Sequence, residues 1–457
     1  MQTITTSLNG KELFTVSRPR VECNLTFEGK THKAEIETRG KSSRFTNKKG
    51  YNVRFAEKVS IFGMSARTHW VFLGEEFDKS YVRNPLTYML GAKLRLVSPE
   101  IKSFVFQVSE PKGPFFWGLY SVTYKPTLED LKADAIVQFD RPDPKKNLYE
   151  PEPGCGVAPL LEEWSREKYA SREDAKAALT SLYQNVTVAD LDMKTFVDYF
   201  LINELSSNSD AYIYSAYTYV RDGKIYAGFL WDFNISYGND FDIYEPFNPS
   251  SPYWHGKFSH LTDVWRYYHN FKFVCSDARL APTSPENYAK PGNENLYDAI
   301  TKNIPNEITF SLNCVNQQTI SAWMMLLVRD PTFVRKVTKR WSYLRCNVFS
   351  YKNILCVLHE LLPSAKVATR DIRNWYQENM TNVTRVVRPV DEPCDFYKQT
   401  VQYLISWIRQ RLNWLDVNIG RERFITSKRD LNNWDNYWVK LNRNDYPLIA
   451  QEVPHKR

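Results

Sequence analysis

Two aspartates lie on either side of a sequence that predicts a tight chain reversal. The segment from Asn203 to Asp240 contains two apolar, aromatic runs separated by Asp222–Gly223. Asp-Gly is typical of a two-residue type I′ turn, because both central positions of that turn need a positive φ. Residue numbers opposed across this hairpin sum to 445, so Ile213 is expected to face Asp232. Asp210 lies three residues beyond that pair. At roughly 3.3 Å per strand residue, the carboxylates of Asp210 and Asp232 start about 10 Å apart.

Carboxylates at neighbouring strand ends suit a divalent cation and a triphosphate. Mg²⁺ prefers oxygen ligands, and Asn234, two residues after Asp232, would add an amide oxygen from the same side. In phosphoryl transfer one carboxylate accepts the proton of the acceptor while another holds the metal. The spacing alone leaves a structural alternative open, because Asp is also a frequent turn and cap residue.

The residues before this segment predict a β-rich region. From Val21 to Phe27, apolar and polar residues alternate with the period of a half-buried strand. Further strands are predicted near residues 34–37, 51–55, 103–108, 117–124 and 135–139. After Asp78, apolar residues recur every four positions, which predicts a helix. The stretch from Arg141 to Pro159 is rich in proline and charge and is the best candidate for a boundary.

The later residues are predominantly helical in pattern. One helix is predicted around Phe196 and Phe200, and a longer one from Val401 to Leu415. Residues 246–316 are rich in Pro, Asn and Ser and predict a long irregular insertion. We therefore predict an α+β fold with a β-rich N-terminal lobe over residues 1–158 and a mostly helical C-terminal lobe over residues 159–457. In this prediction a hairpin at residues 212–231 carries the site.

Composition excludes several classes of protein. The chain of 457 residues has a formal net charge of +8, but its like charges cluster only in short runs, which is more typical of a solvated face than of nucleic-acid binding. No stretch approaches the apolar length of a membrane span, and the N-terminus lacks an apolar signal-peptide core. Seven scattered cysteines without a Cys-x-x-Cys pair indicate reduced thiols, whereas five Asn-x-Ser/Thr sequons have a use only on a secretory route. We expect no nucleic-acid partner, no membrane span, and a cytoplasmic location in preference to a secreted or surface one.

Several motifs resemble those of the CotH kinase family, which is related to spore coat protein H. In the central segment these are Asn203–Glu204–Leu205, Asn208-x-Asp210, and Trp231–Asp232–Phe233–Asn234 followed by Gly238–Asn239. Toward the N-terminus they are Arg39–Gly40–Lys41–Ser42–Ser43, Lys48–Lys49–Gly50–Tyr51, the set Asp78, Ser80, Arg83 and Asn84, and Gly118–Leu119–Tyr120. Late helices add Asp330–Pro331-x-Phe333 and Trp414–Leu415–Asp416. The motifs follow the order of the family over most of the chain, which makes the resemblance more specific than any single motif.

The resemblance implies an atypical protein-kinase-like fold that binds ATP with Mg²⁺ or Mn²⁺ and phosphorylates Ser or Thr hydroxyls of a protein substrate. By position in the motifs, Asp210 matches the catalytic-loop aspartate of the family. Asp232 matches its metal-binding aspartate, and Asn234 matches the second polar position of the same motif.

Basic residues of the matched motifs are candidates for the phosphates. We expect Lys48 and Lys49 near the phosphates of ATP. Arg39 is a further candidate, because guanidinium offers a fixed fork of donors to phosphate oxygens. For Arg83 a structural hydrogen-bonding role is favoured over phosphate binding.

The chain departs from the family pattern in two places. Tyr124 and Lys125 stand where many members carry an acidic residue after Gly-x-Tyr, and Gln138 stands where a charged residue is frequent. In ordinary kinases a lysine–glutamate ion pair must be assembled for activity. The loss of an orienting glutamate predicts weaker nucleotide positioning, so the alternative is a catalytically degenerate binding protein, either a pseudokinase scaffold or a surface adhesin.

Overall fold

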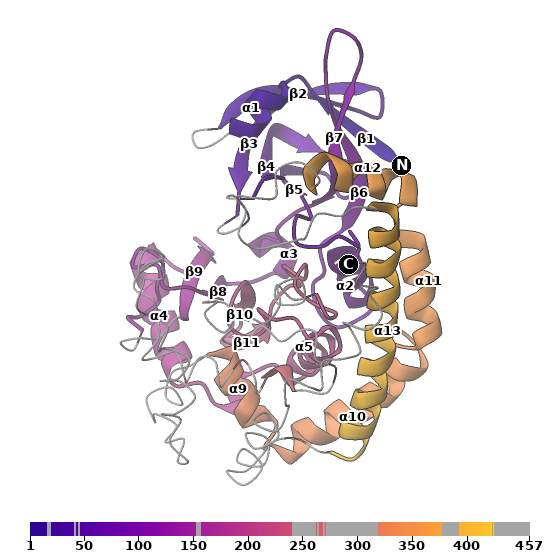
Figure 1. The fold of residues 1–457 in the computed structure, drawn as a ribbon. Coiled ribbons are helices and arrows are strands. Elements are labelled where there is room, and N and C mark those ends of the chain that lie inside the picture. Colours follow the sequence, from indigo (N-terminus) through magenta and orange to yellow (C-terminus); the bar gives the residue numbers. More distant parts are fainter. Residues whose placement is uncertain are drawn as a thin grey trace, which may run out of the picture.

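The computed structural model describes residues 1–15, 20–40, 43, 46–151, 157–239, 262, 265–267, 270, 319–376, 393–422 and 424. Most of the insertion predicted at residues 246–316 lies outside the described residues. Figure 1 shows the N-terminal strands at one end of the molecule and a second sheet, surrounded by helices, at the other.

The N-terminal strands form a closed barrel. Its order is β1 (Gln2–Thr6), β2 (Val21–Phe27), β3 (Lys30–Arg39), β4 (Gly50–Val59), β5 (Arg67–Leu73), β7 (Phe115–Thr123) and β6 (Ile101–Val108). β1 closes the barrel by pairing in parallel with β6. The alternation of the sequence directs one face of each strand inward, where aromatic side chains such as Tyr51, Phe72 and Phe104 are buried. The short helix α1 (Gly10–Thr15) follows β1.

A second sheet contains the predicted hairpin. Its strand order is β11 (Lys224–Ala227), β10 (Ala216–Arg221), β8 (Ala135–Asp140) and β9 (Ala158–Trp164). The predicted turn and register are confirmed: Asp222 and Gly223 have φ values of 51° and 72°, and Thr218 pairs with Ala227. The paired strands are shorter than the predicted 212–231, because Ser215 takes a positive φ of 46° and the strand begins only after it.

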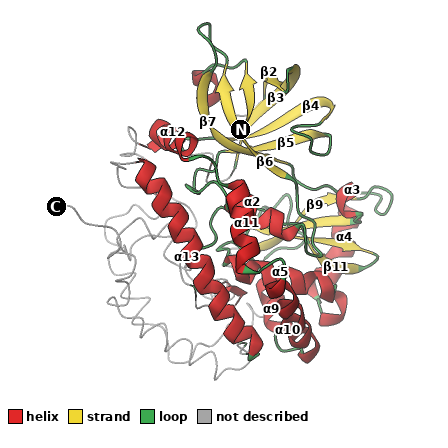
Figure 2. Cartoon of the chain, turned by 90° about the vertical axis from the view of Figure 1, so that its right-hand side faces the viewer, coloured by secondary structure: helices red, strands yellow, loops and turns green. Residues whose placement is uncertain are grey.

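Helices cover the second sheet and reach back to the barrel. They are α2 (Arg83–Gly91), α3 (Leu128–Leu131), α4 (Arg172–Gln184), α5 (Met193–Ser206), α9 (Ile320–Leu327), α10 (Pro331–Cys346), α11 (Tyr351–Leu361), α12 (Ala365–Tyr376) and α13 (Pro393–Gly420), with a short 3₁₀ turn, η2 (Val188–Asp190). α5 is buried on nearly all sides and lies in the centre of the helical region. Figure 2 shows α13 running along one side of the molecule, with α12 placed beside the barrel.

The architecture is α+β, with a β-rich N-terminal region and a helical C-terminal region, as predicted. The boundary at residue 158 stays a prediction, and strand pairing crosses it: β8 precedes this residue but pairs with β10, through Phe139 and Ala216. Among the described helices, none combines the length and the apolar character needed to cross a membrane.

Candidate functional site

Asn208 connects the segments that carry the two candidate aspartates. Helix α5 ends at Ser206, because Ser207 adopts a left-handed backbone with φ of 46°. The Oδ1 atom of Asn208 accepts from the backbone N–H of Asp210 at 3.1 Å. Its Nδ2 atom donates to the backbone carbonyl of Asp232 at 3.5 Å. This buried side chain therefore orders its own segment and contacts the Asp232 segment.

Two further contacts fix the same junction. The Oγ atom of Ser215 donates to Oδ2 of Asp232 at 3.2 Å. The backbone N–H of Ser209 donates to the carbonyl of Ile235 at 3.1 Å. The expected strand pair between Ile213 and Asp232 does not form, because the chain before Ala216 makes turns rather than a strand. The segments meet through side-chain contacts and single backbone hydrogen bonds instead of through a continued hairpin ladder.

The backbone at Asp232 is strained. Its φ of 63° lies in the left-handed region, which costs most residues about 1–2 kcal/mol and costs aspartate less, because its short side chain can hydrogen-bond locally. The following residues form a tight loop that offsets this cost: Ser236 Oγ donates to the Phe233 carbonyl at 2.5 Å, and Asn239 Nδ2 donates to the Asn234 carbonyl at 2.7 Å. Asp210, Asp232 and Asn234 are all partly exposed, so each remains accessible to a ligand.

Arg39 reaches this junction from the barrel. Its guanidinium carbon lies 5.7 Å from the ring centroid of Trp231, the residue directly before Asp232. The pKa of Tyr217 is raised, chiefly by burial. Nearby carboxylates, including that of Asp232, raise this pKa further, whereas the charge of Arg39 lowers it. The charges of Asp232 and Arg39 therefore both act on the buried phenol of Tyr217. The contact brings a cation of the N-terminal region close to the candidate metal ligand.

Lys48 is fully buried and has two partners inside the protein. Its Nζ atom lies 2.6 Å from Oδ2 of Asp371, on α12, and donates to the carbonyl of Leu119 at 2.6 Å. Asp371 also accepts from Tyr81 Oη at 2.8 Å and from the Leu119 N–H at 2.7 Å. Gly118 makes room for the pair, because a Cβ atom there would lie 2.8 Å from Oδ1 of Asp371. That Lys48 contacts a phosphate stays a prediction.

Lys49 is less enclosed than its neighbour. It is half-buried, and its Nζ atom lies 5.5 Å from the ring centroid of Phe14. Burial lowers the pKa of Lys49, and the nearby Glu76 carboxylate opposes that shift. Gly74 packs against this segment so closely that a Cβ atom would lie 3.0 Å from the Lys49 carbonyl oxygen.

The loop between β5 and α2 connects the barrel to the candidate site. Asp78 accepts from the Ser80 N–H at 2.9 Å and forms an ion pair with Arg83. The Nε atom of Arg83 donates to the carbonyl of Ser236 at 2.9 Å. Arg83 therefore makes the structural hydrogen bonds that its sequence context favours.

Glu75, in the same loop, is a buried carboxyl group that the sequence analysis did not identify. It is 4% exposed, and its pKa is raised to about 8, chiefly by burial and then by the charge of Asp78. The side chains of Ser121 and Asn84 lower the pKa by less. No periodicity marks Glu75, because it lies in a loop.

Glu75 predicts a measurable pH dependence of stability. Its pKa in the folded protein, about 8, lies above the ordinary value of 4.5. Between these values the folded chain holds a proton that the unfolded chain has released, so the contribution of Glu75 to stability is complete below about pH 4.5 and is lost as the pH rises through 8. Glu75→Gln is therefore expected to be more stable than the wild type at pH 9, by more than the roughly 1.4 kcal/mol that one pKa unit represents, and equally stable near pH 4.5. Urea unfolding at both pH values measures this difference. The control is the exposed Glu110→Gln. If the free energy of unfolding of Glu75→Gln differs from that of the wild type by the same amount at both pH values, the prediction is contradicted.

The positions that depart from the family pattern belong to other contacts. The guanidinium of Arg67 lies 3.7 Å from the ring centroid of Tyr124. Lys125 forms an ion pair with Glu162 at 3.0 Å. Gln138 Nε2 donates to Oδ2 of Asp140 at 2.8 Å. These side chains therefore have partners of their own within the protein.

The oxygen ligands that the junction offers are of the kinds that a magnesium–nucleotide complex uses. Within the described residues, no three His, Cys, Asp or Glu side chains gather closely enough to hold a metal ion by themselves. Mg²⁺ typically uses one or two carboxylates together with substrate phosphates and water. Asp232, Asn234 and Asp210 are partly exposed residues with carboxylate or amide oxygens, which suits that mode of binding.

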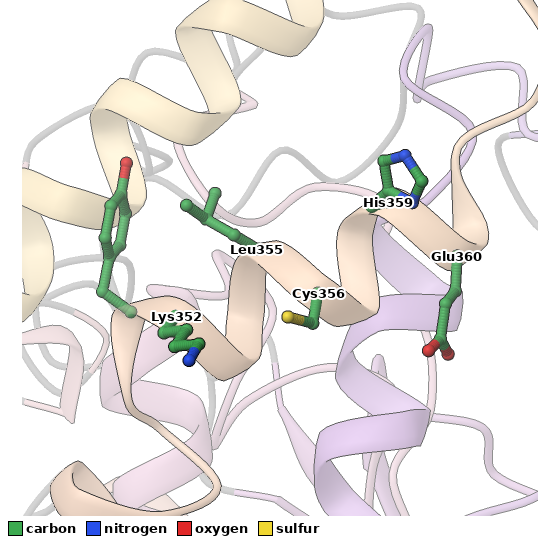
Figure 3. Close-up of a pocket in the computed structure, with 6 residues that line it drawn as sticks. Lys352, Leu355, Cys356, His359 and Glu360 are labelled. Atoms are coloured by element: carbon green, nitrogen blue, oxygen red, sulfur yellow. The ribbon is translucent and has the colours of Figure 1, made fainter.

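A groove on the outer helix α11 is separate from this junction. Tyr351, Lys352, Leu355, Cys356, His359 and Glu360 line it, and all of them belong to α11. Figure 3 shows the last five along this helix. None of the candidate residues is among them, and we assign the groove no role.

The fold and the junction define an α+β protein with two aspartate-bearing segments held together and a barrel arginine beside them. The family model described as CotH kinase protein matches residues 36–415. Because this match covers most of the chain, the chain belongs to the CotH kinase family, and membership indicates a kinase-like protein. A search of curated proteins gave no match.

Proposed function

We propose that the chain is a metal-dependent protein kinase with an atypical kinase-like fold, which transfers phosphate from ATP to Ser or Thr hydroxyls of a protein. The observation that carries the proposal is the junction of the two aspartate segments. It is made by three hydrogen bonds: Asn208 Nδ2 to the Asp232 carbonyl at 3.5 Å, Ser215 Oγ to Asp232 Oδ2 at 3.2 Å, and the Ser209 N–H to the Ile235 carbonyl at 3.1 Å. Family membership supports it independently.

Each candidate residue then has a role. Asp232 and Asn234 would hold Mg²⁺ or Mn²⁺, which neutralises phosphate charge when bound. Asp210 would accept the proton of the acceptor hydroxyl. Arg39 and Lys49 would bind phosphate oxygens from the barrel side.

In the same proposal Lys48 serves ATP binding by fixing this part of the barrel. Its ammonium is bound to Asp371, so it holds the peptide of Lys49 against Gly74. Most of the catalytic effect would come from positioning and charge neutralisation, as in phosphoryl transfer generally.

Thermal-shift titration tests the proposal directly. We expect ATP together with MgCl₂ or MnCl₂ to raise Tm. Either component alone should give a much smaller change, because the proposed site binds the divalent cation and the triphosphate together. Radiolabelled ATP and intact-mass measurement then detect transfer to a general protein substrate or to the chain itself. No stabilisation at millimolar nucleotide with metal contradicts the proposal.

The second candidate function is a degenerate, non-catalytic binding protein. It is favoured by Tyr124 and Gln138, which replace charged residues of the family pattern and make only local contacts. A Tm shift with ATP and metal that is never accompanied by phosphate transfer would favour this candidate.

A further inference from the structure

Two buried side chains connect the loop after β5 with the segment that carries Asp232. The backbone N–H of Phe233 donates to Oδ1 of Asn84 at 2.6 Å. The Nδ2 atom of Asn84 donates to Oε2 of Glu75 at 3.3 Å. We call this chain of contacts, Glu75–Asn84–Phe233, the relay.

The chemistry of the groups fixes the direction of the relay. A backbone N–H can only donate, so it must meet the amide oxygen of Asn84. The NH₂ group of Asn84 is then left for Glu75, whose oxygen accepts it. Asn84 is 2% exposed and Glu75 is 4% exposed, so water does not readily replace either contact.

Both ends of the relay have a strained backbone. Asp232, adjacent to Phe233, has φ of 63°, and Glu75 has φ of 51°. Aspartate adopts this conformation more readily than glutamate does, so the strain is greater at Glu75, and backbone strain is frequent at functional sites.

Helix α2 holds the Asp232 segment at two points. Asn84 binds the N–H of Phe233, and its neighbour Arg83 donates to the carbonyl of Ser236 at 2.9 Å. Ser236 Oγ in turn donates to the Phe233 carbonyl at 2.5 Å. The position of Asp232 therefore depends on the first residues of α2.

Glu75 is an unusual choice for a purely structural contact. Its Oε1 atom makes no hydrogen bond within the part of the chain that the structure describes, although the atom is fully enclosed. Ser121 is near enough to affect the pKa, but it is not in hydrogen-bonding geometry with Oε1. The charged groups that act on this carboxyl group are Asp78 and Lys48. A buried polar atom without a partner is costly, so its presence here calls for an explanation.

We propose that Asn84 and Glu75 are positioning residues for Asp232: Asn84 fixes the peptide next to it, and Glu75 fixes the amide of Asn84. This inference rests on the proposed function, to which it adds two residues that touch neither metal nor substrate. An effect is also expected in the ligand-free protein, where truncation of Asn84 removes the hydrogen-bond acceptor of the Phe233 N–H.

The test uses hydrogen exchange of the Phe233 amide in the ligand-free protein, together with the Kd for ATP in the presence of MgCl₂. Asn84→Ala is expected to speed exchange at Phe233 about 10- to 100-fold and to weaken binding by a similar factor, because a buried donor is left without a partner. Glu75→Leu is expected to change both in the same direction by less. Glu75→Gln should stay within about 3-fold of the wild type, because its amide oxygen still accepts from Asn84.

Thr218→Val is the matched control. Thr218 is buried in β10 and shares a 2.8 Å hydrogen bond with Tyr183 Oη, so its loss costs a comparable contact elsewhere. Exchange at Phe233 that is no faster in Asn84→Ala than in Thr218→Val would overturn the inference, as would a Glu75→Gln variant that behaves like Glu75→Leu. A wild type that binds no ATP with MgCl₂ contradicts the proposed function; a faster Phe233 exchange in Asn84→Ala would still support the relay.

Discussion

Asp232→Asn is expected to reduce metal-dependent ATP turnover by about 10³-fold, which corresponds to about 4 kcal/mol of lost transition-state stabilisation. The substitution removes the charge of the candidate metal ligand and keeps its shape. Asn is also tolerated in the left-handed region, so the φ of 63° at this position is preserved. The contact with Ser215 has an acceptor in either side chain. Tm of the ligand-free protein should therefore change little.

A matched control exists in the hairpin turn. Asp222 is an exposed aspartate that also has a positive φ, of 51°. Asp222→Asn makes the same chemical change at the same type of backbone, far along the hairpin from the junction, and should leave turnover unchanged. Steady-state rates over a range of MgCl₂ concentrations, with Tm measured in parallel, compare the two variants. Full turnover by Asp232→Asn would remove Asp232 from the metal site.

Local sequence signals predicted the elements that depend on local chemistry. The Asp222–Gly223 turn forms because both residues accept a positive φ, and the alternation from Val21 to Phe27 forms a strand because one face is buried. Helix α2 also forms where the apolar repeat after Asp78 predicts a helix. The closure of the barrel was not predictable in this way, since β1 finds its parallel partner β6 about a hundred residues later.

The candidate site depends both on local sequence signals and on contacts between residues far apart in the chain. Asp210 and Asp232 were recognised from their motifs, but they were expected to meet through hairpin register. The observed contacts are instead hydrogen bonds made by Asn208, Ser209 and Ser215. Register could not show this, because the left-handed residue Ser215 ends the ladder before the site. Glu75 was missed because loop residues have no period.

The largest effect on stability is expected at Lys48, whose partner Asp371 lies 323 residues later in the chain. Both side chains are 0% exposed. Lys48→Met leaves a buried carboxylate without its cation, and breaking a buried pair in this way typically costs about 3–5 kcal/mol. Urea unfolding measures the loss. Lys168→Met is the control, because Lys168 is 54% exposed and lies 4.0 Å from Asp134, a geometry typically worth about 0–1 kcal/mol.

The double variant Lys48→Met with Asp371→Leu separates the structural role of Lys48 from phosphate binding. Replacing both members of a buried pair by apolar residues is often neutral, so the double variant should regain most of the stability that Lys48→Met loses. If Lys48 acts by holding the Lys49 peptide, the double variant also keeps ATP binding within about 10-fold of the wild type, about 1.4 kcal/mol. Regained stability with binding lost by far more than this would show that the ammonium itself reaches the phosphates. Stability that stays as low as in Lys48→Met would instead contradict the assignment of the pair as a self-contained contact, because it would mean that Tyr81 and the Leu119 N–H need the Asp371 carboxylate as much as Lys48 does.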